Sequence, residues 1–299
     1  MIKYLHSGEI DRAKWDHCIQ TSRQNLLYGF SWYLDLVSPG WEGLVLDDYK
    51  AVMPLTLKNK LGIKYMYQPL YAQQLGVYSR IYPDMQLTMD FLTALPEDIR
   101  YVDYNLNSFH SMKGMKIRYS RRTNYELKLN TPYEDLESKF SSNTQRNIRK
   151  SLMNSELVNN VSPSELVRLK RQTQVIKMKS EFYEWLNIYL HKMIQAGKGK
   201  IIGVMAGKKL VAASFIALST NRLYYLVSAS SEHGKRTRAM FAIVDHVIGK
   251  YADTGLILDF EGSNIKGVAR FFAGFGAEKK DYYNIRINRL PFPLNIFKK

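Results

Sequence analysis

The sequence has little of what several classes of protein depend on. Cys18 is the only cysteine among 299 residues, which excludes an internal disulfide and a multi-cysteine zinc site. The six histidines show no metal-ligand spacing, so we predict no metal site. No apolar run approaches the roughly 20 residues of a membrane-spanning helix, and the N-terminus lacks the apolar core of a signal peptide. These absences predict a soluble, cytoplasmic protein without a transmembrane segment.

Acidic residues are also scarce. Asp and Glu total 27 against 43 Lys and Arg, a net charge of +16. The excess is uneven, because residues 1–130 carry +3 and residues 131–299 carry +13. A one-sided positive field concentrates anionic partners. Candidate partners are tRNA, a nucleotide-linked substrate, the pyrophosphate of CoA and the anionic lipid of a membrane surface; the alternative is a solubilising surface.

The hydrophobic pattern predicts an α/β (α+β) protein in which one order of elements occurs twice. In the second half we expect strands at residues 124–129, 200–205, 210–220, 222–228, 256–258 and 281–287, and helices at 133–152, 164–173, 180–196, 238–251 and 268–273. In the first half we expect strands at 2–5, 43–46, 51–57, 74–78, 101–106 and 116–119, and helices at 10–21, 32–37 and 85–95. The repeat predicts two tandem domains, residues 1–122 and 123–299, each a mixed, mostly antiparallel sheet flanked by helices.

The most informative segment runs from Leu256 to Ala277. Its apolar start predicts a buried strand, and Asp259 and Glu261 follow at the end of that strand. Because these carboxylates alternate with Phe260, we expect them to share one face. The ends of central strands are where α/β sheets usually keep their ligand sites.

Residues 259–276 closely resemble the C-terminal part of the FemABX-like peptidyl/acyltransferases, which belong to the GNAT-type acyl-CoA N-acyltransferase superfamily. Further matching motifs are Ala51-Val-Met-Pro-Leu55, Gln73-Gln-Leu-Gly-Val77, Ser142-Asn-Thr-Gln-Arg-Asn-Ile-Arg-Lys150 and Leu223-Tyr-Tyr-Leu226. The resemblance implies two tandem GNAT-type domains and transfer of an acyl or aminoacyl group from an activated donor to an amine. In the peptidoglycan-branching members of the family, the donor is aminoacyl-tRNA and the acceptor is a cell-wall precursor peptide.

Two departures from the peptidoglycan-branching members favour an acyl-CoA donor. Those members often carry a functional lysine where this chain has Phe272. The long helical arm of some tRNA-dependent members has no counterpart of the right length here. The resemblance therefore implies an N-acyltransferase that takes acyl-CoA as co-substrate. The alternatives are an aminoacyl-tRNA-dependent peptidyltransferase acting on a peptidoglycan precursor and a non-catalytic anion-binding module that retains the fold.

The donor site implied by this resemblance is the segment of residues 228–239. We expect a loop there whose backbone N–H groups hold an anionic donor against the N-terminus of a helix that starts near Arg238. The alternative is an ordinary solvated loop. The candidate donor-binding residues are Ser230, Gly234, Lys235, Arg236, Thr237 and Arg238.

Three residues are candidates for proton transfer. Glu261 or Asp259 could accept the proton of the amine or bind the amine directly; the alternative is a buried carboxylate that caps the next helix. Tyr283, on the following strand, is a candidate acid for a thiolate leaving group.

A basic helix is the remaining candidate site. Arg146, Arg149 and Lys150 lie within one helical turn and can share a face, where they would contact phosphates of an anionic substrate. We expect them to be exposed and to face the cleft between the domains.

Overall fold

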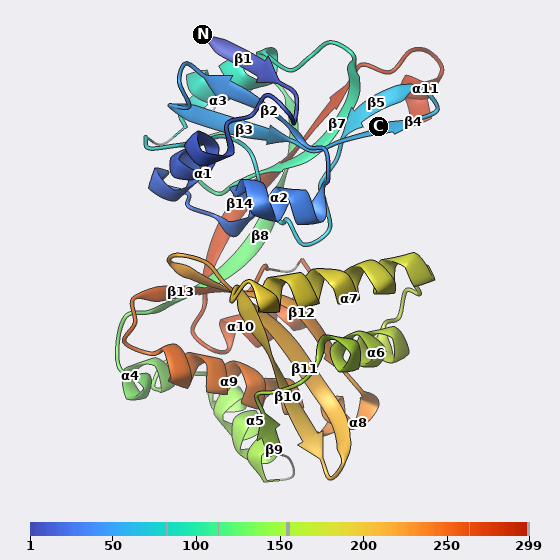
Figure 1. Ribbon diagram of the computed structural model, residues 1–299. Coiled ribbons are helices and arrows are strands. Elements are labelled where there is room, and N and C mark those ends of the chain that lie inside the picture. Colours follow the sequence, from blue (N-terminus) through green and yellow to red (C-terminus); the bar gives the residue numbers. More distant parts are fainter. Residues whose placement is uncertain (82, 113, 154–155, 263, 298–299) are drawn as a thin grey trace. The chain divides into compact units, whose positions relative to one another are not determined.

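The computed structural model describes residues 1–81, 83–112, 114–153, 156–262 and 264–297 (Figure 1). The chain forms two compact units. The first consists of Met1–Thr123 together with Lys280–Lys299, and the second of Asn124–Lys279. Residues 280–299, which the sequence pattern places in the second domain, group with the first unit in the structure. The reason is that β14 (Glu278–Asn288) pairs with β7 (Ile99–Leu106).

The first unit contains two groups of paired strands. One is antiparallel, in the order β1-β2-β3-β6. Its strands are β1 (Ile2–Leu5), β2 (Glu42–Leu46), β3 (Ala51–Leu55) and β6 (Tyr78–Ser79). In the other group, β4 (Leu57–Lys60), β5 (Ile63–Met66), β7 and β14 are neighbours. The pair β5–β7 is parallel, and the other two pairs are antiparallel.

The helices of the first unit cover these strands. They are α1 (Arg12–Thr21), the 3-10 helix η1 (Leu27–Gly29), α2 (Ser31–Val37), α3 (Met85–Thr93) and the short α11 (Leu294–Phe297). Asp11 caps α1 by accepting hydrogen bonds from the N–H groups of Ala13 and Lys14, which are unpaired in any helix. The Trp15 and Trp41 rings meet in the core, with centroids 4.7 Å apart.

The second unit is a sheet with helices on its faces. The strand order is β8-β13-β12-β11-β10-β9, and only the pair β12–β13 is parallel. The strands are β8 (Arg118–Leu129), which begins in the first unit, β9 (Glu156–Val158), β10 (Gly199–Ala206), β11 (Lys209–Leu218), β12 (Arg222–Ser230) and β13 (Leu256–Asp259). The helices are α4 (Tyr133–Glu137), α5 (Ser142–Leu152), α6 (Pro163–Thr173), α7 (Ser180–Gln195), α8 (Glu232–Thr237), α9 (Ala239–Tyr251) and α10 (Lys266–Ala273).

Local sequence explains where these helices start and what they bury. A reciprocal capping box between Ser162 and Glu165, with Pro163 at the first helical position, starts α6. The inner face of α9 carries Ile243, Val247 and other buried apolar residues, which join the core of the unit. Burial of this face holds α9 against the sheet.

Several local expectations were wrong. The strand expected at residues 74–78 is only the two-residue β6. The single helix expected at residues 133–152 is two helices, because Ser141 leaves helical geometry and caps α5. The separate strands expected at 116–119 and 124–129 are one strand, β8. The loop expected after residue 228 is the last part of β12 followed by α8. Ser263, in the segment that carries the resemblance, lies outside the described residues. Within the described residues, no helix is both long enough and apolar enough to span a membrane.

Candidate functional site

Strand β12 has one edge that is only partly paired. β13 pairs with it in parallel from Arg222↔Ile257 to Tyr224↔Asp259. In the part of the chain that the structure describes, no strand continues this edge beyond Tyr224, whereas β12 runs on to Ser230. The opposite edge is paired with β11 as far as Ser230. The free edge therefore offers backbone donors and acceptors to a ligand.

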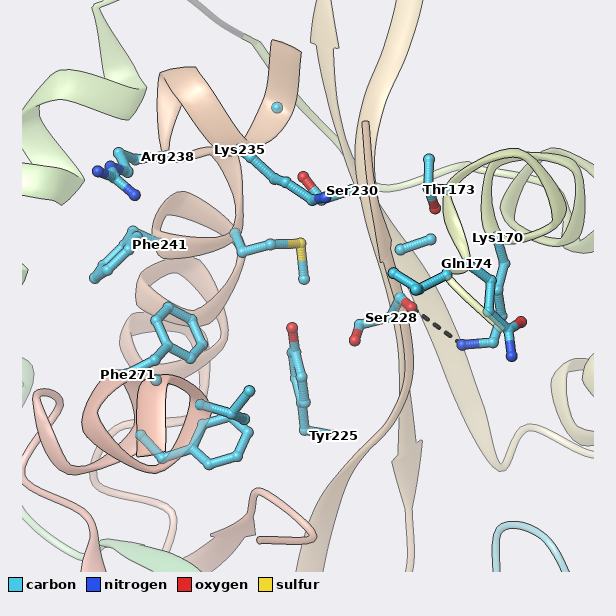
Figure 2. A pocket seen from close by; sticks show the side chains of 17 residues that line it. Lys170, Thr173, Gln174, Tyr225, Ser228, Ser230, Lys235, Arg238, Phe241 and Phe271 are labelled. Atoms are coloured by element: carbon cyan, nitrogen blue, oxygen red, sulfur yellow. Dashed lines mark hydrogen bonds between the residues drawn. The ribbon is translucent and has the colours of Figure 1, made fainter. Parts of the chain in front are cut away.

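A cavity of about 510 Å³ lies along this free edge. Figure 2 shows Tyr225, Ser228 and Ser230 of β12 between Lys170 of α6 and Phe241 of α9. Residues of α8 and α10, together with Gln174 and Val175 after α6, complete the lining. Ligand sites of this size are commonly concave, with mostly apolar walls and a few convergent polar groups.

One wall of the cavity is apolar and aromatic. Met240, Phe241, Val268 and Phe271 belong to it. The rings of Phe241 and Phe271 meet edge to face, with centroids 4.7 Å apart and an interplanar angle of 90°. Such pairs have defined geometry in addition to the burial of their area. This wall suits an apolar group of a ligand.

The polar lining is cationic. Lys170 Nζ donates to the carbonyl oxygen of Ser228 over 3.4 Å, and burial lowers the pKa of this ammonium. Lys235 also lines the cavity and pairs with Glu232 over 2.6 Å. Arg238 is exposed at the joint between α8 and α9, with a positive φ of 64°. Among the described residues that line the cavity none is Asp or Glu, so the cavity favours an anionic ligand.

The N-terminus of α9 adds to this preference. Its cap residue is Arg238, and among the described side chains none caps the N-terminal N–H groups. Arg238 and Met240, at the start of the helix, both line the cavity. Uncapped N–H groups and the helix dipole attract anions within about one turn.

Tyr225 is a buried residue that contributes a phenol to the cavity lining. Burial raises the pKa of its phenol to about 12, although hydrogen bonds with Ser228 and Ser214 act in the opposite direction. The phenol therefore keeps its proton at neutral pH. The β11–β12 register shifts beside it, since Ile216 faces Tyr225 and Phe215 faces Val227. This bulge leaves Leu226 without an opposite residue and changes the direction of the side chains beyond it.

The predicted donor residues separate into two groups. Ser230, Gly234, Lys235 and Arg238 line the cavity, whereas Arg236 and Thr237 do not. Packing also requires a glycine at position 234, because a Cβ there would lie 2.3 Å from the carbonyl oxygen of Val211. Its missing side chain lets α8 pack on β11. That these residues bind a donor stays a prediction.

The two predicted carboxylates lie elsewhere in the unit. Asp259 is fully buried; it accepts from Asn124 Nδ2 at 3.0 Å and from the Glu261 N–H at 2.8 Å, and Arg222 lies 3.5 Å away. Burial, followed by the nearby Glu126 carboxylate, raises the pKa of Asp259. Glu261 follows the strand, with a φ of 55°. The shared strand face was therefore a wrong expectation, because β13 ends at Asp259. Neither residue lines the cavity.

The other candidates are placed as follows. Tyr283 lies on β14 in the first unit, where its ring meets Tyr119 edge to face at 5.7 Å. Arg146, Arg149 and Lys150 are exposed on α5, as expected, and Arg146 donates to Asn143 Oδ1 at 2.8 Å. None of these residues lines the cavity. Their roles in proton transfer and phosphate binding stay predictions.

Several lining residues carry no functional signal in the sequence. Lys170 comes from α6, more than fifty positions before β12, and only the fold brings the two together. Phe241 and Phe271 carry no signal in the sequence that separates them from core residues on helical faces. Tyr225 stood in a motif that carried the family resemblance, and that motif was the one available signal. In the described residues, no group of three His, Cys, Asp or Glu side chains is placed to hold a metal ion.

The sequence matches no protein family model and no curated protein. Solved structures are similar in fold. FemX superposes with a TM-score of 0.65 at 12% identity, over 99% of this chain and 99% of that one. L-PGS from Bacillus licheniformis gives 0.56 at 12% identity, over 96% and 94%. A tandem GNAT protein from the clavulanic acid biosynthesis pathway gives 0.55 at 10% identity, over 97% and 99%.

The chain has a FemX-like fold. The tandem GNAT neighbour and the mixed sheets flanked by helices confirm the predicted fold class of two GNAT-type domains. In this FemX-like chain, the cavity at the free edge of β12 belongs to the second unit alone.

Proposed function

We propose that the protein is an N-acyltransferase that takes its acyl group from a CoA-type thioester and transfers it to an amine. The donor would occupy the cavity along the free edge of β12. The observation that supports this most is the composition of that cavity, which joins a cationic rim to an apolar aromatic wall and has no carboxylate among its described lining residues.

The two parts of the lining match the two parts of such a donor. Arg238, Lys235 and the uncapped N-terminus of α9 suit a pyrophosphate. The apolar wall of Met240, Phe241 and Phe271 suits the acyl chain and the arm that carries it. The free edge of β12 suits the amide groups of that arm, which would pair with it as a strand does.

The same composition argues against an aminoacyl donor. An aminoacyl ester carries an α-ammonium group, and a buried ammonium needs a counter-ion. Among the lining residues this group would meet Lys170, Lys235 and Arg238 but no Asp or Glu. An uncharged acyl group avoids that penalty. We therefore favour an acyl-CoA over an aminoacyl-tRNA as the donor.

The chemistry needs few groups. The amine nitrogen forms a bond to the thioester carbonyl carbon, the C–S bond breaks, and the proton lost by the amine ends on the thiol. Negative charge develops on the carbonyl oxygen and then on sulfur. The protonated phenol of Tyr225 is a suitable hydrogen-bond donor for that charge. Glu261 and Asp259 keep their proposed role as proton acceptors, and Arg146, Arg149 and Lys150 their proposed role toward an anionic substrate.

Calorimetric titration tests the donor site, with CoA, acetyl-CoA and octanoyl-CoA as probes. We expect all three to bind, and octanoyl-CoA to bind most tightly because of the apolar wall. Arg238→Ala should weaken each by roughly fivefold to tenfold. The matched control is Arg236→Ala, which removes an exposed arginine of the same segment that does not line the cavity.

Other outcomes separate the alternatives. Equal losses in Arg238→Ala and Arg236→Ala would reduce the effect to general surface charge. Binding of aminoacyl-tRNA without binding of any CoA species would favour the peptidyltransferase alternative. Tight CoA binding without acyl transfer to a panel of amines would favour the non-catalytic anion-binding module.

A further inference from the structure

The turn between β4 and β5 in the first unit has a backbone conformation that its residues do not favour. Its two residues, Leu61 and Gly62, both have positive φ, 53° and 76°. Two-residue turns of this kind strongly prefer Asn-Gly, because a bulky side chain is strained at positive φ. Leu61 also buries almost no surface, since 93% of it is exposed. A residue that costs stability and buries almost no surface calls for a functional reason.

Other apolar side chains are exposed beside this turn. Phe292 is 79% exposed, and Leu294 and Ile296 are also exposed. Leu294 and Leu61 line the same cavity, of about 640 Å³, so the turn and the C-terminal segment form one surface. Figure 1 shows α11 close to the β4–β5 hairpin. Tyr65, in the wall of this cavity, is half-buried. Tyrosines with a buried ring and a solvent-exposed hydroxyl are typical of membrane interfaces.

Apart from Asp103, the charged side chains of this surface are cationic. Lys58 and Lys60 are exposed, and they lie opposite Tyr65 and Ile63 in the hairpin register, hence on the cavity face. Residues 49–83 and 282–297, which supply most of the surface, contain no Asp or Glu. Asp103 lines the cavity, but its carboxylate is held by Asn284 at 2.7 Å and Arg286 at 3.1 Å.

From these observations we infer that the tip of the β4–β5 hairpin and the segment around α11 bind the surface of an anionic lipid bilayer. Leu61 and Phe292 enter the interface between headgroups and acyl chains, and Lys58 and Lys60 lie against the headgroup phosphates. A protein partner would not require apolar side chains at the tip of a strained turn ringed by lysines. A bilayer accepts both without shape complementarity.

Vesicle sedimentation with the full chain tests this inference. The probes are vesicles of phosphatidylcholine alone, and vesicles of phosphatidylcholine and phosphatidylglycerol in equal parts. We expect binding to the anionic vesicles only, decreasing with added salt. Leu61→Asn and Lys60→Glu should each reduce the partition coefficient by about tenfold. Leu61→Asn places the preferred residue at the turn and should keep or raise the melting temperature, so misfolding cannot explain its loss of binding.

The matched control is Ile176→Asn in the second unit. Ile176 is 75% exposed and lies beside Lys177, so it tests whether any basic apolar surface gives the same result. We expect its binding to equal that of the parent. As a second readout, Leu61→Cys labelled with an environment-sensitive dye should shift to the blue on anionic vesicles. The native Cys18 is buried and does not compete for the label.

Three results would overturn the inference: no binding of the parent to anionic vesicles, unchanged binding of Leu61→Asn and Lys60→Glu, or loss of binding in Ile176→Asn alone. Analytical ultracentrifugation supplies a fourth. If the parent is a dimer and Leu61→Asn is a monomer, the surface is covered by a second copy of the chain rather than by lipid.

Discussion

Each unit has a parallel backbone contact at the end of a strand, and the chain beyond that contact is completed differently in the two units. In the second unit, β12 and β13 pair only as far as Tyr224↔Asp259, and a cavity follows along β12. In the first unit, Leu75 makes a parallel bridge with Leu106 of β7. The backbone beside that bridge is not exposed for a ligand. Side chains from the segment that follows β7 form hydrogen bonds with it.

Buried polar side chains take the place of a ligand in the first unit. Asn107 Nδ2 donates to the carbonyl oxygen of Leu75 at 2.8 Å. His110 Nε2 accepts the N–H of Val77 at 3.0 Å, and its Nδ1 lies 2.9 Å from the Thr88 hydroxyl. Gln74 accepts the N–H of Ser108 at 2.9 Å. The backbone that β12 offers to solvent is here satisfied within the protein.

This difference teaches that one fold can use the same edge for stability or for binding. In the first unit, hydrogen bonds from buried side chains occupy this edge and stabilise the unit. Leaving it open costs the second unit backbone hydrogen bonds, which a bound ligand would restore. Four experiments test the contrast, in order of decreasing expected effect at a fixed pH or, for the last one, per pH unit.

Replacement of His110 should open the closed edge and strongly lower the free energy of unfolding. His110→Ala leaves the N–H of Val77 without its partner and leaves the Thr88 hydroxyl only its bond to the carbonyl oxygen of Asp84. We expect this to lower the free energy of unfolding by about 3 kcal/mol. Denaturant titration measures the loss. His17→Ala is the matched control, because His17 is exposed on α1 and should change stability little. Equal stability of both variants would contradict the assigned role of His110.

A bulky side chain on β12 should close the open edge. Ser228 is half-buried and faces the cavity, so Ser228→Trp places a ring where the donor would lie. We expect donor binding to weaken on the order of 100-fold by steric exclusion. Calorimetry with octanoyl-CoA measures this, and thermal melting checks that the fold is kept. Unchanged affinity would remove the cavity from the donor site.

The phenol of Tyr225 should matter for turnover more than for binding. Tyr225→Phe keeps the ring and removes the hydrogen-bond donor. We expect kcat to fall roughly 30-fold with little change in the Kd of the donor, because the hydroxyl would act on charge that develops only during reaction. If kcat stays and only the Kd rises, the hydroxyl serves binding alone.

The closed edge should also make stability depend on pH. Burial lowers the pKa of His110 to about 3, far below its value near 6.5 in an unfolded chain. Because the folded pKa is depressed, this contribution is fully present above pH 6.5 and is lost as the pH falls toward 3. The loss should be about 1.4 kcal/mol per pH unit within that window. Comparing the pH dependence of unfolding in the parent and in His110→Ala isolates it; parallel curves would contradict the assignment.

Much of the fold was predictable, and the reasons are local. Alternating strands, a Pro-containing capping box and the apolar face of α9 are read directly from neighbouring residues. The shape of the site was less predictable. Whether β12 has a partner beyond Tyr224 depends on where β13 ends, and the sequence placed Asp259 and Glu261 on a strand that stops at Asp259.

Residues distant in sequence were the hardest to predict. Lys170 reaches the site only through the packing of α6 beside β12. The hairpin of β4 and β5 was absent from the sequence-based prediction, because Leu61 hides the turn that an asparagine would have signalled. Short strands, whose neighbours are set by tertiary contacts, carry weak signals of their own.

The return of β14 to the first unit has a consequence for synthesis. β7 must wait for residues 283–288, which pair with Tyr101–Leu106, and the whole second unit is translated in between. During that interval one edge of β7 has no strand to cover it, and an uncovered edge invites pairing with other chains. The second unit, contiguous in sequence, can fold while the first is still incomplete. Its folding also shortens the effective span between β7 and β14, so the unit that carries the open site helps the other one to close.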